Sequence, residues 1–189
     1  HKESLVVKPG KTSSIVELFR LLRNNVQFLM TKKDDKVVLV TSSISGEGKT
    51  FVSTNLASSF ALLGKKVALV GLDIRSPQLA NMPKLQETSG VTSFLSNDDT
   101  SLSDISQKVP EVDNLDVFVA GAIPPNPSEL LLGERTEQLF NNLREKYDVI
   151  IIDSAPIAMV SDTFSLAKFG DATLFVTRAN HTKRNLITT

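Results

Sequence analysis

The chain of 189 residues contains no cysteine, no tryptophan, one tyrosine and two histidines. The absence of cysteine excludes a disulfide framework and cysteine metal sites, and it is typical of a reducing compartment. Two histidines, one of them the terminal His1, cannot build a zinc site without cysteine. No combination of His, Ser and Asp suggests acyl transfer.

The chain also lacks an excess of either charge, because 21 basic side chains balance 21 acidic ones. No global field therefore draws it to nucleic acid, and we expect no nucleic-acid partner. Its longest apolar runs are as short as strands, so we predict no membrane span, and no signal peptide is visible. With 41% hydrophobic and 22% charged residues, the sequence predicts one globular domain.

A glycine-rich loop at residues 43–50 reads Ser-Ile-Ser-Gly-Glu-Gly-Lys-Thr. It follows an apolar run at 36–41 and precedes a helix-like stretch at 51–57, which is the order that a phosphate-binding loop requires. Such a loop points backbone N–H groups at an anion, and the helix N-terminus adds partial positive charge. A chance match on a surface turn is the alternative, and the flanking strand and helix argue against it. We predict nucleotide contacts from Ser45, Gly46, Glu47, Gly48, Lys49, Thr50 and Phe51.

Two further apolar runs end in carboxylates, at Asp73 and at Asp153. The carboxyl ends of parallel strands line the ligand crevice, so Asp73 and the nearby Arg75 should emerge beside the loop. Each aspartate alone could be a turn residue or an ordinary strand end. Together with Lys49, Thr50 and Arg75, they supply what phosphoryl transfer from ATP requires. Thr50 and Asp153 are expected to hold Mg²⁺, and Asp73 is expected to act as the base that receives a proton or as a second metal contact.

A helix is predicted from Ser13 or Ser14 to about Met30. Its spacing places a core-facing stripe at Ile15, Phe19, Leu22, Val26 and Leu29. The opposite, polar arc contains Glu17, Arg20, Asn24 and Gln27, with Arg23 at its margin. Apolar Leu21 and Phe28 leave the core stripe, which is typical of packing against a second molecule. On spacing alone, an ordinary exposed Glu17–Arg20 pair is the favoured interpretation.

The remaining pattern alternates strands and helices. We expect an extended arm at 1–12, with His1 a tag remnant or a cut edge, and one domain at 13–189. Short helices are predicted at 91–95 and 102–106, a strand at 115–119, and a helix with Ser128 as N-cap. The last elements are a helix at 134–146 buried through Leu139, Phe140 and Leu143, a helix at 162–169, a strand at 172–177 and a helix from about Thr182. This order predicts an α/β fold, a three-layer P-loop domain with a mainly parallel sheet and helices on both faces.

The sequence resembles the cytoplasmic kinase domain of bacterial tyrosine kinases (BY-kinases), which are related to the MinD/ParA ATPases. The resemblance covers most of the chain, from about residue 17 to 178. It rests on the loop at 42–50, the Leu-Asp-Ile-Arg-Ser-Pro stretch at 72–77 (a second Walker A motif), the Walker B strand at 149–156, the E-x-x-R-x-x-R helix at 17–23 and the stretch at 125–131. Ser43 in place of the first loop glycine is usual in that family. Position 44 carries a signature lysine in MinD and ParA, and Ile44 argues against a partitioning ATPase.

The resemblance implies transfer of the γ-phosphate of Mg·ATP to tyrosines of a neighbouring subunit, with ADP as product. It implies that Lys49, Asp73, Arg75 and Asp153 carry catalysis. It also implies a ring assembled through Glu17, Arg20 and Arg23, which favours a subunit contact at this helix. A membrane-spanning chain-length domain in the same or a partner chain would tether the domain to the inner face of the inner membrane. The system would control polysaccharide polymerisation and export, and a tyrosine phosphatase is expected.

Two departures from the family pattern leave alternatives open. Gly71 stands where the family has the first aspartate of Asp-x-Asp-x-Arg, so the chain could be a nucleotide-binding assembly module with weak kinase activity or none. A hydrolase of the MinD/ParA type is a further alternative, which Ile44 disfavours. The family's tyrosine cluster is also missing, since Tyr147 is the single tyrosine. Either the cluster lies beyond Thr189, which we favour, or the protein lacks it.

Overall fold

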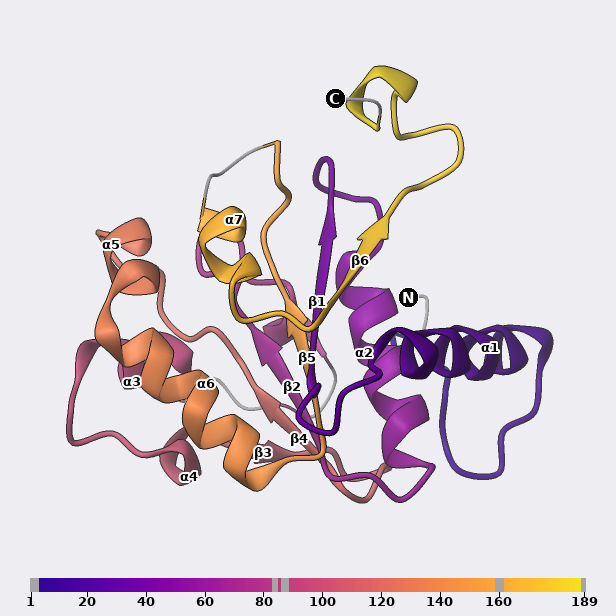
Figure 1. The fold of residues 1–189 in the computed structure, drawn as a ribbon, viewed down its shortest axis with the longest axis horizontal. Coiled ribbons are helices and arrows are strands. Elements are labelled where there is room, and N and C mark those ends of the chain that lie inside the picture. Colours follow the sequence, from indigo (N-terminus) through magenta and orange to yellow (C-terminus); the bar gives the residue numbers. More distant parts are fainter. Residues whose placement is uncertain (1–3, 83–84, 86–88, 159–161, 188–189) are drawn as a thin grey trace.

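The carboxyl ends of the central strands lie along one edge of a twisted sheet, with helices on either side (Figure 1). The structure is a computed structural model that describes residues 4–82, 85, 89–158 and 162–187. Within these residues the strand order is β3-β4-β2-β5-β1-β6. Five strands are parallel: β1 (Val37–Ser42), β2 (Val67–Gly71), β4 (Leu115–Phe118), β5 (Val149–Asp153) and β6 (Ala172–Val176). The short β3 (Gln107–Lys108) pairs antiparallel with β4 and was not predicted.

Helices cover both faces of the sheet, as the α/β prediction requires. One face is covered by α1 (Ser14–Leu29) and α2 (Lys49–Ala61). The other is covered by α3 (Val91–Ser96), α4 (Leu102–Ile105), α5 (Pro127–Leu132), α6 (Glu134–Lys146) and α7 (Asp162–Ala167). Successive strand residues alternate between the two faces, so Ile150 and Ile152 join one core and Ile151 joins the other. The continuous apolar runs therefore are buried on both sides, and the three-layer fold is confirmed.

Most elements lie where the sequence predicts them. The short helices α3 and α4 and the helix α6 with buried Leu139, Phe140 and Leu143 are confirmed. The Ser128 N-cap was wrong, because Asn126 is the N-cap of α5. Pro127 then occupies the first helical position, where its missing N–H costs nothing. In place of a helix from Thr182, the described residues form a single 3-10 turn, Arg184–Leu186.

The core-facing stripe predicted for α1 was partly wrong. Phe19 and Val26 are buried and Leu22 is half-buried, but Ile15 and Leu29 are 36% and 61% exposed. Val16 is buried instead. The face of α1 that is turned toward the rest of the domain, called its seam below, runs through positions 16, 19, 23 and 26. Such a narrow stripe is typical of one helix packed against another.

The segment of residues 4–8 has no helix or strand and lies along α2. The Asn55 amide holds it, accepting from the N–H groups of Val6 at 2.8 Å and Val7 at 3.0 Å and donating to the Ser4 carbonyl at 2.9 Å. The Leu5 and Val7 side chains are buried. This segment is thus part of the domain's packing. In the described part of the chain, none of the helices combines the length and the apolar character needed to span a bilayer.

Candidate functional site

Three adjacent strands bring the predicted site residues together. β5 lies between β1 and β2, with Asp153 opposite Val40 on one side and Gly71 on the other. The Asp153 carbonyl accepts from the N–H groups of Leu72 at 2.9 Å and Asp73 at 3.1 Å. The glycine-rich loop after β1 and the two aspartates therefore meet at one edge of the sheet, as predicted from the carboxyl ends of parallel strands.

The loop's backbone has the geometry that its glycines allow. Gly46 and Gly48 have φ angles of +83° and +99°, in the region that other residues rarely occupy, and Gly48 is the N-cap of α2. The first N–H groups of α2 have no partner within the helix. This helix end therefore offers backbone donors and partial positive charge to an anion.

A cavity of about 300 Å³ opens in front of the loop. Its lining combines loop, helix and β2-loop residues: Ser45, Gly46, Gly48, Lys49, Thr50, Phe51, Asp73, Ser76 and Gln78. Six of the seven residues predicted to contact nucleotide line it, Glu47 being the exception. Phe51 also packs edge-on against Phe19 of α1, with 5.8 Å between ring centroids.

Asp153 is buried at the base of the site, 2% exposed. Its Oδ2 accepts a 2.7 Å hydrogen bond from the Thr50 hydroxyl, and its Oδ1 lies 3.4 Å from the Ser53 hydroxyl. Burial raises the pKa of Asp153 to about 6, and the negative charge of Asp73 adds to the rise. The Thr50 hydrogen bond and the positive charge of Lys49 oppose it. Ser53 was not predicted, although its position three residues after Thr50 places both on one face of α2.

The fit to Mg²⁺ rests on this donor set. Mg²⁺ prefers carboxylate and hydroxyl oxygens together with phosphate oxygens and water. Asp153 and Thr50 present such oxygens side by side. A buried carboxylate whose ionised form is penalised by desolvation gains from a cation next to it. Within the described residues no group of three or more His, Cys, Asp and Glu side chains forms a metal site of its own. The residues therefore fit a metal that phosphates help to hold.

Asp73 and Arg75 diverge after β2. Asp73 is buried and its Oδ1 accepts from the Ser76 N–H at 3.0 Å, while its side chain faces the cavity. Arg75 is exposed and donates at 2.7 Å to the Ser128 hydroxyl of α5. Arg75 thus ties the β2 loop to the 125–131 stretch that carried part of the family resemblance.

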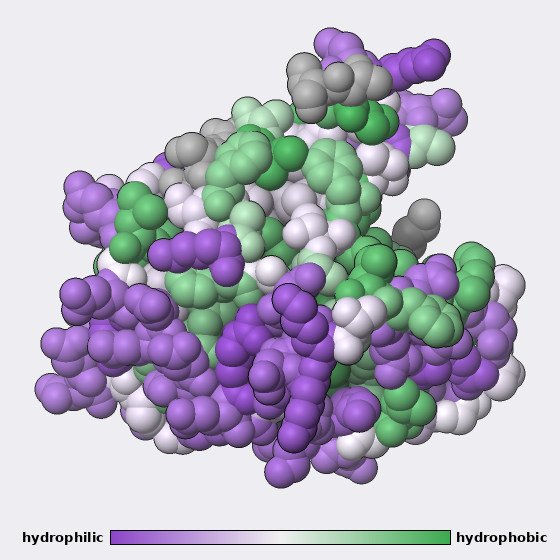
Figure 2. All heavy atoms as spheres, in the orientation of Figure 1, coloured by the Kyte–Doolittle hydropathy of each residue, from purple (hydrophilic) through white to green (hydrophobic). Residues whose placement is uncertain are grey.

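The three motif residues of α1, Glu17, Arg20 and Arg23, have different surroundings. Arg20 and Glu17 form an exposed ion pair at 2.6 Å. Arg23 is half-buried, and its Nη1 donates at 3.0 Å to the Ser59 carbonyl near the C-terminal end of α2. Helix ends leave carbonyls without partners, so Arg23 caps α2 within the same molecule. Leu18, Leu21 and Phe28 are 63%, 57% and 79% exposed, and Figure 2 shows apolar residues at the surface over α1 among hydrophilic ones.

Tyr147 lies at the opposite, amino-terminal edge of the sheet. Its hydroxyl donates at 2.6 Å to Oδ2 of Asp116, and Lys108 forms an ion pair with Oδ1 of the same carboxylate. Burial, followed by the interactions with Asp116, raises the pKa of Tyr147 above its usual value. This hydroxyl is far from the loop's edge of the sheet and already has a partner.

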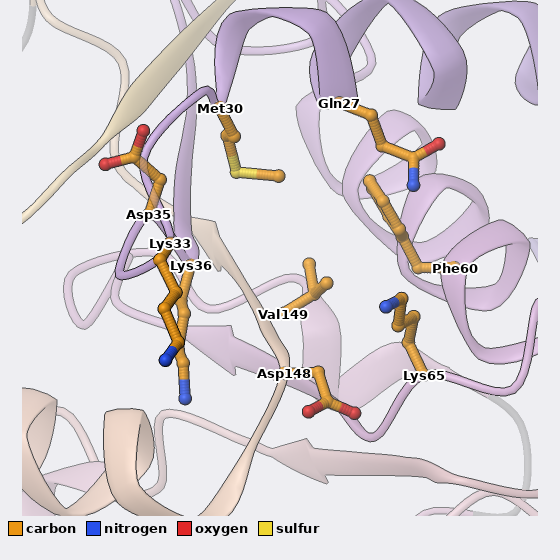
Figure 3. Close-up of a pocket in the computed structure, with 9 residues that line it drawn as sticks. All are labelled: Gln27, Met30, Lys33, Asp35, Lys36, Phe60, Lys65, Asp148 and Val149. Carbon is orange, nitrogen blue, oxygen red and sulfur yellow. The ribbon is translucent and has the colours of Figure 1, made fainter.

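A second cavity of similar volume, about 310 Å³, also lies away from the loop (Figure 3). It is lined by Gln27, Met30, Lys33, Asp35, Lys36, Phe60, Lys65, Asp148 and Val149. Its charges are of both signs and local bonds hold several of them, such as the 2.6 Å bond from Lys36 Nζ to the Arg144 carbonyl. The phosphate-loop cavity has fewer charged residues in its lining. It combines the backbone donors at the start of α2 with Lys49 and the Asp73 carboxylate, which is the set of groups that phosphoryl chemistry uses.

The fold and the loop define an α/β protein of the P-loop class. A family model described as an AAA domain matches residues 35–179. The tyrosine-protein kinase YwqD of Bacillus subtilis is 36% identical over 168 residues, which are 89% of this chain and 70% of that protein. The tyrosine-protein kinase CpsD of Streptococcus agalactiae serotype III is 36% identical over 172 residues, covering 90% of this chain and 72% of that protein. The chain belongs to the family of bacterial tyrosine kinases.

Solved structures agree. The kinase domain of the Escherichia coli tyrosine kinase ETK matches with a TM-score of 0.90 at 29% identity, over 97% of this chain and 71% of that chain. The septum site-determining protein MinD of Pyrococcus horikoshii, solved with Mg-ADP, matches with a TM-score of 0.60 at 22% identity, over 76% of this chain and 58% of that chain. The second likeness shows the fold alone.

Proposed function

We propose that the chain binds Mg·ATP at the loop of residues 43–50 and, in the full-length protein, transfers the γ-phosphate to tyrosines of a neighbouring subunit. Lys49 holds the phosphates, and Thr50 and Asp153 hold the metal. Asp73 acts as the base or as a second metal contact, and Arg75 steadies the β2 loop through Ser128. The observation that carries the proposal is the contact of the Thr50 hydroxyl, which lines the phosphate-loop cavity, with the buried carboxylate of Asp153.

The chemistry follows from charge and position. A phosphoryl group in transfer spreads charge over its oxygens, which Lys49 and a metal neutralise. A tyrosine hydroxyl is a poor nucleophile at neutral pH, so in-line placement beside a carboxylate supplies most of the acceleration. Asp73 is the carboxylate that faces the cavity and is not hydrogen-bonded by Thr50.

The test is incubation of the full-length protein with Mg·ATP, followed by mass spectrometry for phosphotyrosine, with Lys49→Met as control. We expect phosphotyrosine in the wild type and none in the variant. Tyr147 should remain unmodified, because its hydroxyl is bound to Asp116. Phosphotyrosine that persists in Lys49→Met would contradict the proposed site.

A second candidate function is favoured by Gly71, which lies opposite Asp153 where the family has a carboxylate. In this case the chain is an assembly module in which nucleotide sets the oligomeric state while transfer is slow. Nucleotide binding without phosphotyrosine would support it. Gly71→Asp should then raise transfer, and an unchanged rate would mean that Gly71 does not limit it.

We further propose that copies assemble into a ring through α1, in a system that controls surface-polysaccharide polymerisation and export. A membrane-spanning domain tethers the kinase domain to the inner face of the inner membrane, and a phosphatase reverses the modification. The exposed apolar residues of α1 and the exposed Glu17–Arg20 pair support a subunit contact. Because Arg23 caps α2 in the same molecule, Glu17→Ala with Arg20→Ala is the cleaner probe. We expect this pair of substitutions to lower the oligomer mass of the full-length protein in light scattering; an unchanged mass argues against the contact.

A further inference from the structure

Glu47 is the one charged residue of the phosphate loop whose side chain is buried without lining the cavity. It is 4% exposed, and its Oε2 accepts at 2.9 Å from the N–H of Ile44 across the loop. Its Oε1 accepts a hydrogen bond from the hydroxyl of Thr182, which lies 135 residues further along the chain. Burying a negative charge within an anion-binding loop is unfavourable unless hydrogen bonds compensate for the lost solvation. The residues that donate to Glu47 are therefore needed to keep its carboxylate in the loop.

Those partners belong to a turn that follows β6. In residues 178–182, the N–H of Thr182 donates at 2.9 Å to the carbonyl of Arg178, and the N–H of Arg178 donates at 2.8 Å to the Thr182 hydroxyl. The turn is thereby closed on itself, and the Thr182 hydroxyl is fixed in the direction of Glu47. Hydrogen bonds to Glu47 outweigh the opposite effect of its burial, so its pKa lies below the usual value.

Two more contacts connect the turn with the loop's backbone. Nη1 of Arg178 donates at 3.1 Å to the carbonyl of Gly46, and Nε2 of His181 lies 3.1 Å from the carbonyl of Ser45. In a trans peptide the C=O and the following N–H point in opposite directions. The N–H groups of Gly46 and Glu47 therefore point away from the turn.

The turn contacts the loop outside the lining of the cavity. Ser45 and Gly46 line the cavity, whereas Arg178, His181 and Thr182 do not belong to its lining. With their carbonyls held by the turn, the two peptide units present their N–H groups inward, which is the orientation a phosphate requires. A glycine at position 46, with φ of +83°, could otherwise turn these units over at little cost.

We infer that the turn of residues 178–182 holds the phosphate loop in its binding conformation, with Glu47, Arg178, His181 and Thr182 as positioning residues. The turn acts on the phosphates through the loop and makes no contact with the nucleotide base. This inference rests on the proposed binding of nucleotide at the loop.

The test compares Thr182→Val, which removes the hydroxyl and keeps the shape, with Thr182→Ser, which keeps the hydroxyl. Calorimetry measures the dissociation constants of Mg·ADP and of inorganic tripolyphosphate with Mg²⁺ for the 189-residue chain. We expect Thr182→Val to weaken both ligands by about tenfold and Thr182→Ser to restore both to within about twofold of the wild type. Circular dichroism at the same temperature checks that each variant is folded.

A second pair guards against a variant that fails to fold. His181→Ala removes the group beside the Ser45 carbonyl at an exposed position, and His181→Gln keeps a donor there. The alanine variant should weaken the binding of both ligands and the glutamine variant should not.

Loss of Mg·ADP affinity with unchanged tripolyphosphate affinity would overturn the inference, because the turn would then contact the base. Unchanged affinities for both ligands in folded Thr182→Val and His181→Ala would overturn it as well, while the proposed function would stand. A wild type that binds neither ligand would refute both.

Discussion

The hydroxyl of Thr50 donates a 2.7 Å hydrogen bond to the buried carboxylate of Asp153, joining the first turn of α2 to the end of β5. These residues are 103 positions apart in the chain. The bond fixes two oxygens side by side at the base of the phosphate-loop cavity. Its electrostatic setting also makes the fold sensitive to pH.

Asp153 should make the folded state less stable as pH rises. Its folded pKa of about 6 exceeds the value of 3.8 for an unperturbed Asp, so between pH 4 and 6 the folded chain binds more protons than the unfolded chain. Without metal or nucleotide, Asp153→Asn should therefore gain about 2–3 kcal/mol in free energy of unfolding relative to wild type between pH 4 and pH 7.5. Urea unfolding in EDTA at both pH values measures this. A difference between variant and wild type that does not depend on pH would contradict the prediction.

Gly71→Asp should destabilise the chain unless a cation is present. A Cβ at position 71 would lie 3.4 Å from the Ala120 nitrogen and the Leu79 side chain, so it fits with small adjustments. The added carboxylate, however, would be buried opposite Asp153. We expect a loss of about 2–3 kcal/mol in EDTA, partly recovered with Mg·ADP, against less than about 1 kcal/mol for the Gly71→Ala control. Equal stability of the two variants in EDTA would show that the site tolerates a third carboxylate without metal.

The two arginines of α1 should have different effects on the stability of a single molecule. Arg23→Ala removes a charged donor from the Ser59 carbonyl and should lower the free energy of unfolding by about 1–2 kcal/mol. Arg20→Ala breaks only an exposed pair and should change it by less than about 0.5 kcal/mol. Urea unfolding at low protein concentration separates the two, and equal losses would contradict the capping role of Arg23.

Asn55→Ala should release the segment of residues 4–8 from α2. The Asn55 side chain makes four hydrogen bonds, three to this segment and one at 2.9 Å to the Phe51 carbonyl. We expect a loss of about 3 kcal/mol and faster proteolysis between residues 4 and 8. The control is Ser103→Ala, since Ser103 is an exposed residue of α4 on the other face of the sheet. A segment that stays protected in Asn55→Ala would mean that burial of Leu5 and Val7 suffices to hold it.

The sheet and the site's main residues could be predicted because their signals are local. Continuous apolar runs that end in Asp73 and Asp153 describe buried parallel strands, and the glycines of residues 43–50 specify a tight loop. The seam of α1 was harder to predict, because hydrophobicity placed Ile15 and Leu29 inside. Arg23 lies in the observed seam because its guanidinium reaches the end of α2, and periodicity cannot reveal that partner.

The bonding of Glu47 could not be predicted for a similar reason. Its position in the loop made it a candidate nucleotide contact, yet its side chain is bound by Thr182, beyond the sheet's last described strand. Contacts between residues so far apart in sequence depend on β6 pairing with β1, which delivers residues 178–182 to the loop. The spacing of residues in a single sequence does not indicate that residues 178–182 contact the phosphate loop.

The attachment of residues 4–8 to Asn55 has a mechanical consequence. Asn55 lies six residues, or about 9 Å, along α2 from Lys49, which begins the helix. A helix transmits axial displacement over such a distance with little deformation. Tension applied to the chain before Ser4 would therefore be transmitted through Asn55 to the helix that carries Lys49 and Thr50. The affinity of the site for a phosphate would then depend on that tension.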